Sequence, residues 1–299
     1  MDTVQRSEVK RLLDEQPELV KVAPIRLCPT CKHPAPDRFC SACGEQILVR
    51  PDYSFRGFFL ETLNVFTNLE SNIFRSFSLL LTKPGLLTVE YFKGRRKLYL
   101  KPLQLFIFCN VIFFLVQAYT DFNSLRTPLW VHLHSLPHSA LARRMVYGAI
   151  AKSGVTYDQY QFRFNAAIET QAKTLVFLMI PLLAIGLKLV YLRRKEYFVK
   201  HLVFSTHFYS FYLLMLASFY LLIRVITDLL RGSSTYFNDL SMTVIVLSCS
   251  FIYLMLGVRC AYESSWLMSA VRSLCLLAVV AVAIQTFRAI LFFTTFYTI

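Results

Sequence analysis

The sequence predicts an all-α integral membrane protein with about five transmembrane helices, preceded by interfacial amphipathic helices and a small four-cysteine zinc ribbon. Three observations predict this class. The 299 residues have a mean hydropathy of +0.48 and are 56% hydrophobic, above the roughly 45–50% that is usual for soluble domains. Several apolar runs approach the roughly 20 residues that a helix needs to cross the hydrocarbon core. Two Cys-x-x-Cys pairs precede those runs.

The residues before the first span divide into three predicted parts. Residues 1–25 form a polar lead-in without the apolar run and cleavage site of a signal peptide, so we expect no cleaved signal. Residues 26–50 hold the ribbon, and residues 51–101 are expected to form amphipathic juxtamembrane helices. Phe and Leu recur there at steps of three and four between residues 54 and 81. This pattern indicates helices that pack on the membrane domain or lie in the bilayer interface.

The membrane domain is predicted to cover residues 102–299, with an external loop at 120–173. We expect spans near residues 103–119, 174–192, 204–226, 240–261 and 271–293. Basic residues gather in 93–101 and 193–200, which predicts a cytoplasmic amino terminus and an external carboxyl terminus. The net charge of +14 is therefore attributed mainly to membrane topology, and no nucleic-acid partner is expected.

Cys28, Cys31, Cys40 and Cys43 have the spacing of a structural zinc site. Each Cys-x-x-Cys turn supplies two thiolates, and two turns complete a tetrahedral shell that leaves no open position for water or substrate. The alternative is a redox dithiol of the thioredoxin kind, although that motif occurs singly in a βαβ context. We therefore expect structural Zn²⁺ as the cofactor, with His33 as a bystander, and a surface of the ribbon that contacts a protein partner.

Three ionisable residues are expected in or near the spans: His201, His207 and Arg288. Ionisable side chains inside a bilayer are functional candidates because they are costly to bury there. The two histidines are six positions apart, which is about 600° around a helix, so they do not share one face. The structural alternative places His201 at the interface and lets His207 hydrogen-bond a neighbouring helix.

A second histidine group, His132, His134 and His138, falls in the external loop. Imidazoles of this kind bind Zn, Cu or Ni, and in a strand His132 and His134 would share a face. No carboxylate stands nearby in the sequence to orient them, which argues against a metal role. The sequence contains no Ser/His/Asp constellation, phosphate-binding glycine loop or pair of carboxylates on one span, so no enzymatic activity is expected.

Several motifs occur in a specific order along the chain. They are Cys-Pro-x-Cys…Phe-Cys-x-x-Cys-Gly at residues 28–44, Leu-x-x-Lys-Pro-Gly at 80–85, Tyr-Phe-x-Gly-x-Arg at 91–96, Pro102 before the first span, and His-Leu-Val-Phe-Ser-x-His at 201–207. Over roughly residues 26–215 this order resembles the bacterial membrane family known as domain of unknown function 3667. The resemblance implies a protein of the bacterial inner membrane with an amino-terminal zinc ribbon, and it implies no activity.

These observations favour a non-catalytic scaffold or assembly factor in the lipid bilayer, whose cytosolic ribbon contacts partner proteins. Two alternatives remain open. One is a transporter or metal-handling protein in which His207, Arg288 and the external histidines line a path. The other is an enzyme that uses the intramembrane histidines, for example a haem or quinone protein. Function must be argued from a site, and only the four cysteines form a complete one in the sequence.

Overall fold

The computed structural model describes residues 26–37, 39–47, 70–120, 125–229 and 239–299. The chain divides into two compact units, Met1–Pro51 and Asp52–Ile299. The predicted polar lead-in and residues 51–69 of the predicted amphipathic region lie outside the described residues.

The first unit is small and has little apolar core. Strand β1 (Arg26–Leu27) pairs antiparallel with β2 (Pro34–Ala35), and an isolated bridge joins Phe39 to Gln46. Each pairing closes a turn that contains one Cys-x-x-Cys. Among the described residues of this unit, the buried apolar ones are Cys28, Ala35, Cys40 and Ile47. A cluster of this size cannot stabilise a fold without a further cross-link, such as a bound metal ion.

The second unit is helical. Its elements are α3 (Glu70–Thr82), α4 (Leu86–Phe92), α5 (Pro102–Thr120), α6 (Leu129–His134), α7 (Ser139–Ser153), α8 (Tyr157–Leu175), the 3-10 turn η1 (Val176–Leu178), α9 (Met179–Val190), α10 (Phe198–Leu229), α11 (Asp239–Tyr262) and α12 (Trp266–Thr298). Five helical segments in the described part of the chain are long and apolar enough to cross a membrane: 102–120, 157–190, 198–229, 241–262 and 266–298. They confirm the predicted class of an all-α membrane protein.

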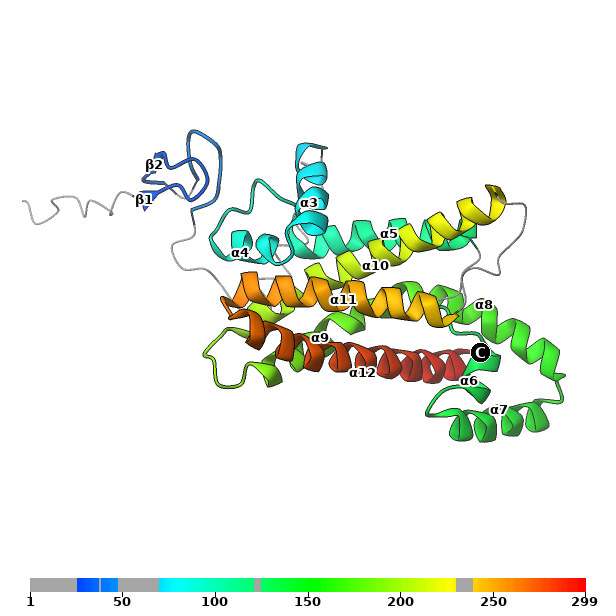
Figure 1. Ribbon diagram of the computed structural model, residues 1–299. Helices are drawn as coiled ribbons and strands as arrows, with labels where there is room; N and C mark the ends of the chain where they lie inside the picture. Colours follow the sequence, from blue (N-terminus) through cyan, green and yellow to red (C-terminus); the bar gives the residue numbers. More distant parts are fainter. Residues whose placement is uncertain (1–25, 38, 48–69, 121–124, 230–238) are drawn as a thin grey trace, which may run out of the picture. The chain divides into compact units, whose positions relative to one another are not determined.

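The long helices pack side by side, with α10 along α5 and α9, and α12 along α8, α9 and α11 (Figure 1). Helix α10 is buried on all sides between residues 199 and 217, as expected for a helix that is apolar around its whole circumference. The other spans expose large apolar side chains, among them Leu115, Leu189 and Leu267. An outer surface of this kind suits contact with the acyl chains of a lipid bilayer.

The break predicted at Pro84-Gly85 separates α3 from α4. Gly85 has a φ of +83°, and a Cβ at this position would lie 2.5 Å from the carbonyl oxygen of Gly257 in α11. Only glycine meets both conditions, because it lacks a Cβ and adopts positive φ readily. The short helix α4 therefore rests directly on the backbone of α11, close to the end of that helix.

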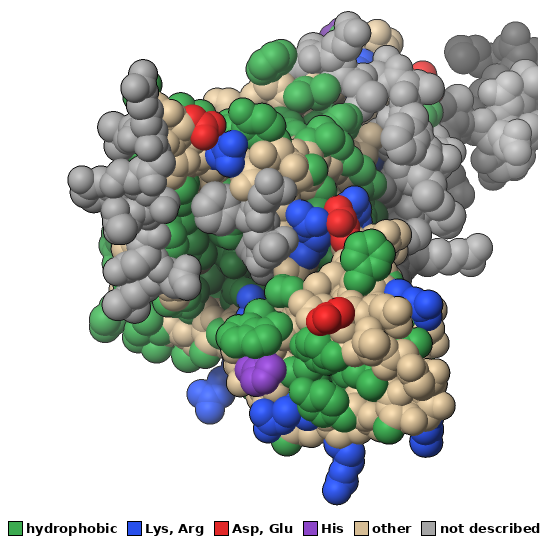
Figure 2. All heavy atoms as spheres, turned by 90° about the vertical axis from the view of Figure 1, so that its right-hand side faces the viewer, with side chains coloured by type: hydrophobic (Ala, Val, Ile, Leu, Met, Phe, Trp, Pro, Cys, Tyr) green, Lys and Arg blue, Asp and Glu red, His purple; other side chains and the backbone are tan. Residues whose placement is uncertain are grey.

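The stretch 120–173, predicted as an external loop, contains α6, α7 and α8. Buried residues follow one face of α8 at steps of four, namely Tyr160, Phe164, Ile168 and Ala172, and α8 continues through η1 into α9 as one segment. Figure 2 looks onto the end of the unit that holds α6 and α7. Lys and Arg side chains are spread around this face instead of forming one patch.

Candidate metal centre and buried polar sites

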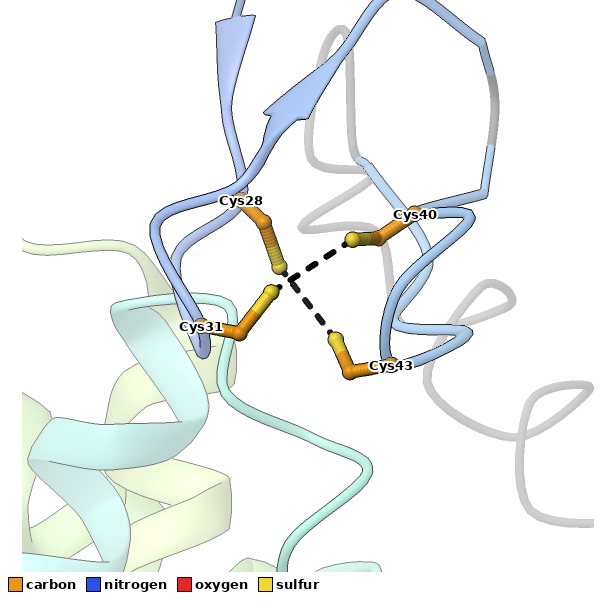
Figure 3. Close-up of side chains that lie close together, drawn as sticks. All are labelled: Cys28, Cys31, Cys40 and Cys43. Carbon is orange, nitrogen blue, oxygen red and sulfur yellow. Dashed lines mark hydrogen bonds between the residues drawn. The ribbon is translucent and has the colours of Figure 1, made fainter.

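The side chains of Cys28, Cys31, Cys40 and Cys43 converge on one point (Figure 3). Their sulfur atoms all lie within 4.8 Å of one another, with 3.5 Å between Cys28 and Cys43 and 3.5 Å between Cys31 and Cys40. Thiolates about 2.3 Å from a tetrahedral Zn²⁺ lie about 3.8 Å apart, whereas a disulfide requires about 2.05 Å. The arrangement therefore fits a four-coordinate metal ion and does not fit a disulfide.

The two Cys-x-x-Cys turns share one backbone conformation. Lys32 N–H donates to the Cys28 carbonyl at 3.0 Å, and Gly44 N–H donates to the Cys40 carbonyl at 2.7 Å. Both donors have positive φ, 63° for Lys32 and 68° for Gly44. The turn therefore requires a left-handed residue after the second cysteine, which glycine adopts readily and lysine adopts at a cost. The first turn has Lys32 where the second has Gly44, and the two turns nevertheless share the same backbone conformation.

The thiol pKa values of this cluster shift in opposite directions. The N–H of Cys43 lowers the pKa of the Cys40 thiol to about 6, with a further contribution from the N–H of Ala42 and against the opposing effect of desolvation. A backbone hydrogen bond also lowers the pKa of Cys43 and of Cys31, but desolvation and the neighbouring thiols outweigh it, so the pKa of Cys43 is raised to about 12 and that of Cys31 is also raised. One thiolate among neighbouring thiols is thus favoured, and metal ions bind the thiolate form. Thr30 Oγ1 donates to Glu45 Oε2 at 2.7 Å and joins the two turns. His33 is exposed and lies outside the cluster of four sulfurs.

His201 lies in a stack of aromatic rings where α9, α10, α11 and α12 meet. Its Nδ1 lies 2.8 Å from Tyr262 Oη, and the rings of Tyr262 and Tyr191 stack with centroids 4.3 Å apart. The Arg272 guanidinium lies over the Tyr191 ring, 4.5 Å from its centroid, and Arg194 donates to the carbonyl oxygen of Tyr262. These contacts link His201 to residues near the ends of α9, α11 and α12, while its Nε2 is buried with no hydrogen-bond partner among the described residues.

His207 is buried and forms a hydrogen bond to a helix that was not among the predicted spans. Its Nδ1 lies 2.9 Å from Thr88 Oγ1 in α4, and both side chains are buried. Helix α4 also carries the buried Glu90, whose carboxylate contacts Arg95 at 2.8 Å and Lys93 at 3.7 Å. The sequence pattern does not single out Thr88 or Glu90. Two polar residues within a short apolar segment, Leu86–Phe92, are the signal that could have identified them.

A narrow pocket lies beside His207, with a cavity volume of about 10 Å³, roughly the space of one water molecule. Leu87, Leu100 and Pro102 contribute to its walls. Its polar and charged lining comes from Tyr91, Arg95, Arg96, Tyr99, Lys101 and His207. Most of these residues come from the basic loop between α4 and α5.

Arg288 lies in α12, far along the chain from the two histidines of α10. It is partly buried, and its Nε has no hydrogen-bond partner among the described residues. Its positive charge acts on His132, near the end of the unit that holds α6. His201, His207 and Arg288 thus have separate surroundings, and the structure does not assemble them into one site.

Two of the external histidines form a pair. His132 Nδ1 lies 2.9 Å from His138 Nε2, and the His132 ring packs against Phe164 and Phe292, with centroids 5.9 and 5.2 Å away. His132 and His134 both lie in helix α6 and not in a strand, and His134 is exposed. Residues two positions apart do not share a face of a helix.

Burial lowers the pKa of His132 to about 3, with smaller effects of the same sign from His138 and Arg288. Burial also lowers the pKa of His138. Neutral imidazoles are therefore packed among aromatic rings. Among the described residues, the groups of three or more His, Cys, Asp or Glu that can share a metal ion comprise the four cysteines alone.

The helices and the cysteine cluster define a multi-pass α-helical membrane protein with a candidate metal site. Residues 70–114 match the family model described as "Protein of unknown function (DUF3667)". The match covers α3, α4 and part of α5. It contains the motifs at 80–85 and 91–96, but neither the four clustered cysteines nor the histidines of α10. Searches of the curated proteins and of the solved structures found no match.

Proposed function

We propose that this chain is a non-catalytic scaffold or assembly factor of a bacterial inner membrane, with Zn²⁺ in the four-cysteine site and with the first unit as a contact surface for a protein partner. The observation that carries the proposal is the chemistry of the cluster. Four thiolates complete a zinc shell, which leaves no position for a substrate. Such a site stabilises a small surface and does not perform a reaction.

Zinc is supported by the donor set. Thiolate ligands in a tetrahedral arrangement favour Zn²⁺ or an iron–sulfur centre over hard cations. The four sulfurs lie within 4.8 Å of one another, which is the scale of a single ion. The described part of the unit, residues 26–37 and 39–47, has a very small apolar core, so the free energy of metal binding is also the free energy that folds it.

The partner surface is supported by two large apolar side chains that the first unit leaves in solvent. Leu27 is 63% exposed and Phe39 is 55% exposed. Each directly precedes the first cysteine of its pair, so the two occupy equivalent positions in the two turns. A unit this small gains stability from burying apolar side chains, and leaving these two outside favours their use in a contact.

A cytoplasmic location of the first unit is supported by the charges around the spans. The basic loop 93–101 and the basic turn 193–195 lie at one end of the helical unit, where α5 and α10 begin and α9 ends (Figure 1). Basic loops remain on the cytoplasmic side of inner-membrane proteins. The reducing cytoplasm also keeps thiols available for zinc.

Site-specific photocrosslinking in native membranes tests the proposed contact. A photoreactive residue at position 27 or 39 should yield a discrete protein adduct, whereas one at Asp37, an exposed polar position of the same unit, should not. The adduct should disappear in the Cys28→Ser/Cys40→Ser variant. Crosslinks to lipid alone, or equal yields from all three positions, would overturn the scaffold proposal.

A further inference from the structure

The basic loop between α4 and α5 is held in a defined position. Asn72 Nδ2 donates to the Lys97 carbonyl at 2.7 Å, and Leu100 N–H donates to the buried Ser76 Oγ at 2.8 Å. Lys101 N–H donates to Gln104 Oε1 at 3.1 Å. These bonds tie the loop to α3 and to the first turn of α5. The pocket beside His207 is therefore prearranged, which lowers the entropy cost of binding a ligand.

Positive charge dominates this pocket. The segment 86–102 contains five basic residues and one acidic residue, Glu90. Glu90 contacts Arg95 and Lys93. Arg96 is held over the Tyr91 ring, 4.1 Å from its centroid, and with Lys101 it lines the pocket. An anionic ligand is the class that this balance of charge attracts.

His207 supplies a hydrogen-bond donor to the same pocket. Among the described residues, its Nδ1 is the partner of the Thr88 hydroxyl, which carries one proton and can donate it there. We therefore assign the imidazole proton to Nε2. His207 is only 4% exposed, and it lines the pocket. A buried donor beside Arg and Lys side chains is the arrangement that binds phosphate oxygens.

The pocket also lies at the beginning of an apolar span. Pro102, one of its lining residues, begins the first apolar span, and phosphates lie at the boundary of the hydrocarbon core. The cavity volume is about 10 Å³, which is room for roughly one oxygen-sized group. One phosphate oxygen would therefore enter the pocket toward His207, and the rest of the phosphate group would lie at its mouth.

We propose that the pocket formed by α4, the basic loop 93–101 and His207 of α10 binds a phosphate group, with Arg96 and Lys101 as charged contacts and His207 Nε2–H as a buried donor. The ligand is either a phosphate-bearing lipid headgroup or a soluble phosphate. All residues of this site belong to the second unit. The proposal therefore does not depend on the metal cluster or on its proposed protein partner.

Isothermal titration calorimetry on the full-length protein in phosphate-free detergent tests the proposal. The probes are inorganic phosphate, dihexanoyl phosphatidylglycerol, and dihexanoyl glycerol, which lacks phosphate. The pocket variant is Arg96→Gln/Lys101→Gln. The matched control is Arg193→Gln/Lys195→Gln, which removes the same charge from two exposed residues of the other basic turn. His207→Asn tests the buried donor, with thermal unfolding as the check that each variant is folded.

We expect saturable binding of at least one phosphate probe and none of dihexanoyl glycerol. The Kd should rise by about tenfold or more in the pocket variant, because bonds to a charged group are strong. It should change by less than about twofold in the control, since exposed charges act weakly. Binding of phosphatidylglycerol alone identifies a lipid site, and binding of inorganic phosphate identifies a soluble ligand. Equal weakening in both double variants, or saturation by neither phosphate probe, would overturn the proposal.

Discussion

Nδ1 of His207 lies 2.9 Å from Oγ1 of Thr88, although the two residues are 119 positions apart in the sequence. The bond joins the short helix α4 to α10 inside the helical unit. With the hydroxyl assigned as the donor, the imidazole proton lies on Nε2. A segment outside the five spans thus supplies the hydrogen-bond partner of an ionisable residue within one of them.

Replacing Thr88 by Val should destabilise the helical unit. The change preserves shape but leaves Nδ1 of His207 without its partner, which costs about 1 kcal/mol in a membrane helix bundle. Thermal unfolding of the purified protein measures the effect. Thr82→Val is the control, because the exposed Thr82 hydroxyl donates to the Ser78 carbonyl within its own helix. Equal melting temperatures for the two variants would show that the Thr88 bond contributes nothing.

Gly85→Ala should destabilise the protein more than Gly154→Ala does. Both glycines have positive φ, so both changes carry a backbone cost of about 1 kcal/mol. A Cβ at Gly154 meets nothing within 4 Å, whereas one at Gly85 would lie 2.5 Å from a backbone oxygen of Gly257. A flexible side chain could rotate away from the added Cβ, but the backbone of Gly257 cannot. Gly85→Ala should therefore force α4 and α11 apart and disrupt their packing. Comparable unfolding temperatures would contradict the close approach of these helices.

Elemental analysis of the purified protein should find one zinc ion per chain. Cys28→Ser should abolish it, because three thiolates leave the shell incomplete. Cys275→Ser should retain it, since that exposed cysteine belongs to α12. Removal of the metal with a chelator should expose residues 26–47 to proteolysis while the helical content persists. Metal retained in Cys28→Ser, or a metal other than zinc, would contradict this expectation.

Stability should fall as the pH decreases from 6.5 toward 3, and His132 should contribute to the loss. Burial lowers the pKa of His132 to about 3, against about 6.5 in an unfolded chain. The unfolded state binds the proton first, so stability falls by at most about 1.4 kcal/mol per pH unit in this window. Melting temperatures at pH 7 and pH 4.5 measure the effect.

The matched pair for this test is His132→Gln and His134→Gln. The first change should reduce the pH dependence of the melting temperature, because it removes the buried imidazole. The second should preserve it, because His134 is exposed on the same helix. An unchanged pH dependence in His132→Gln would assign the acid sensitivity to other groups.

The sequence by itself determined the membrane class and the candidate metal cluster. Both depend on local information. A span is recognised from continuous hydropathy, and Cys28 to Cys43 lie within sixteen consecutive residues, so the turns alone bring the sulfurs together. The Pro84-Gly85 break is equally local, because it follows from the backbone preferences of two residues.

Only the tertiary structure decided the partners of the polar residues. The pairs Thr88–His207 and Tyr262–His201 depend on which helices become neighbours. The hydropathy of a span does not reveal which helices lie next to it. Residues 157–173 show the same limit: their buried face recurs at steps of four, but their polar positions obscured the continuation of α8 into the span. Hydropathy reports transfer into lipid, whereas burial between helices depends on packing contacts between distant parts of the chain.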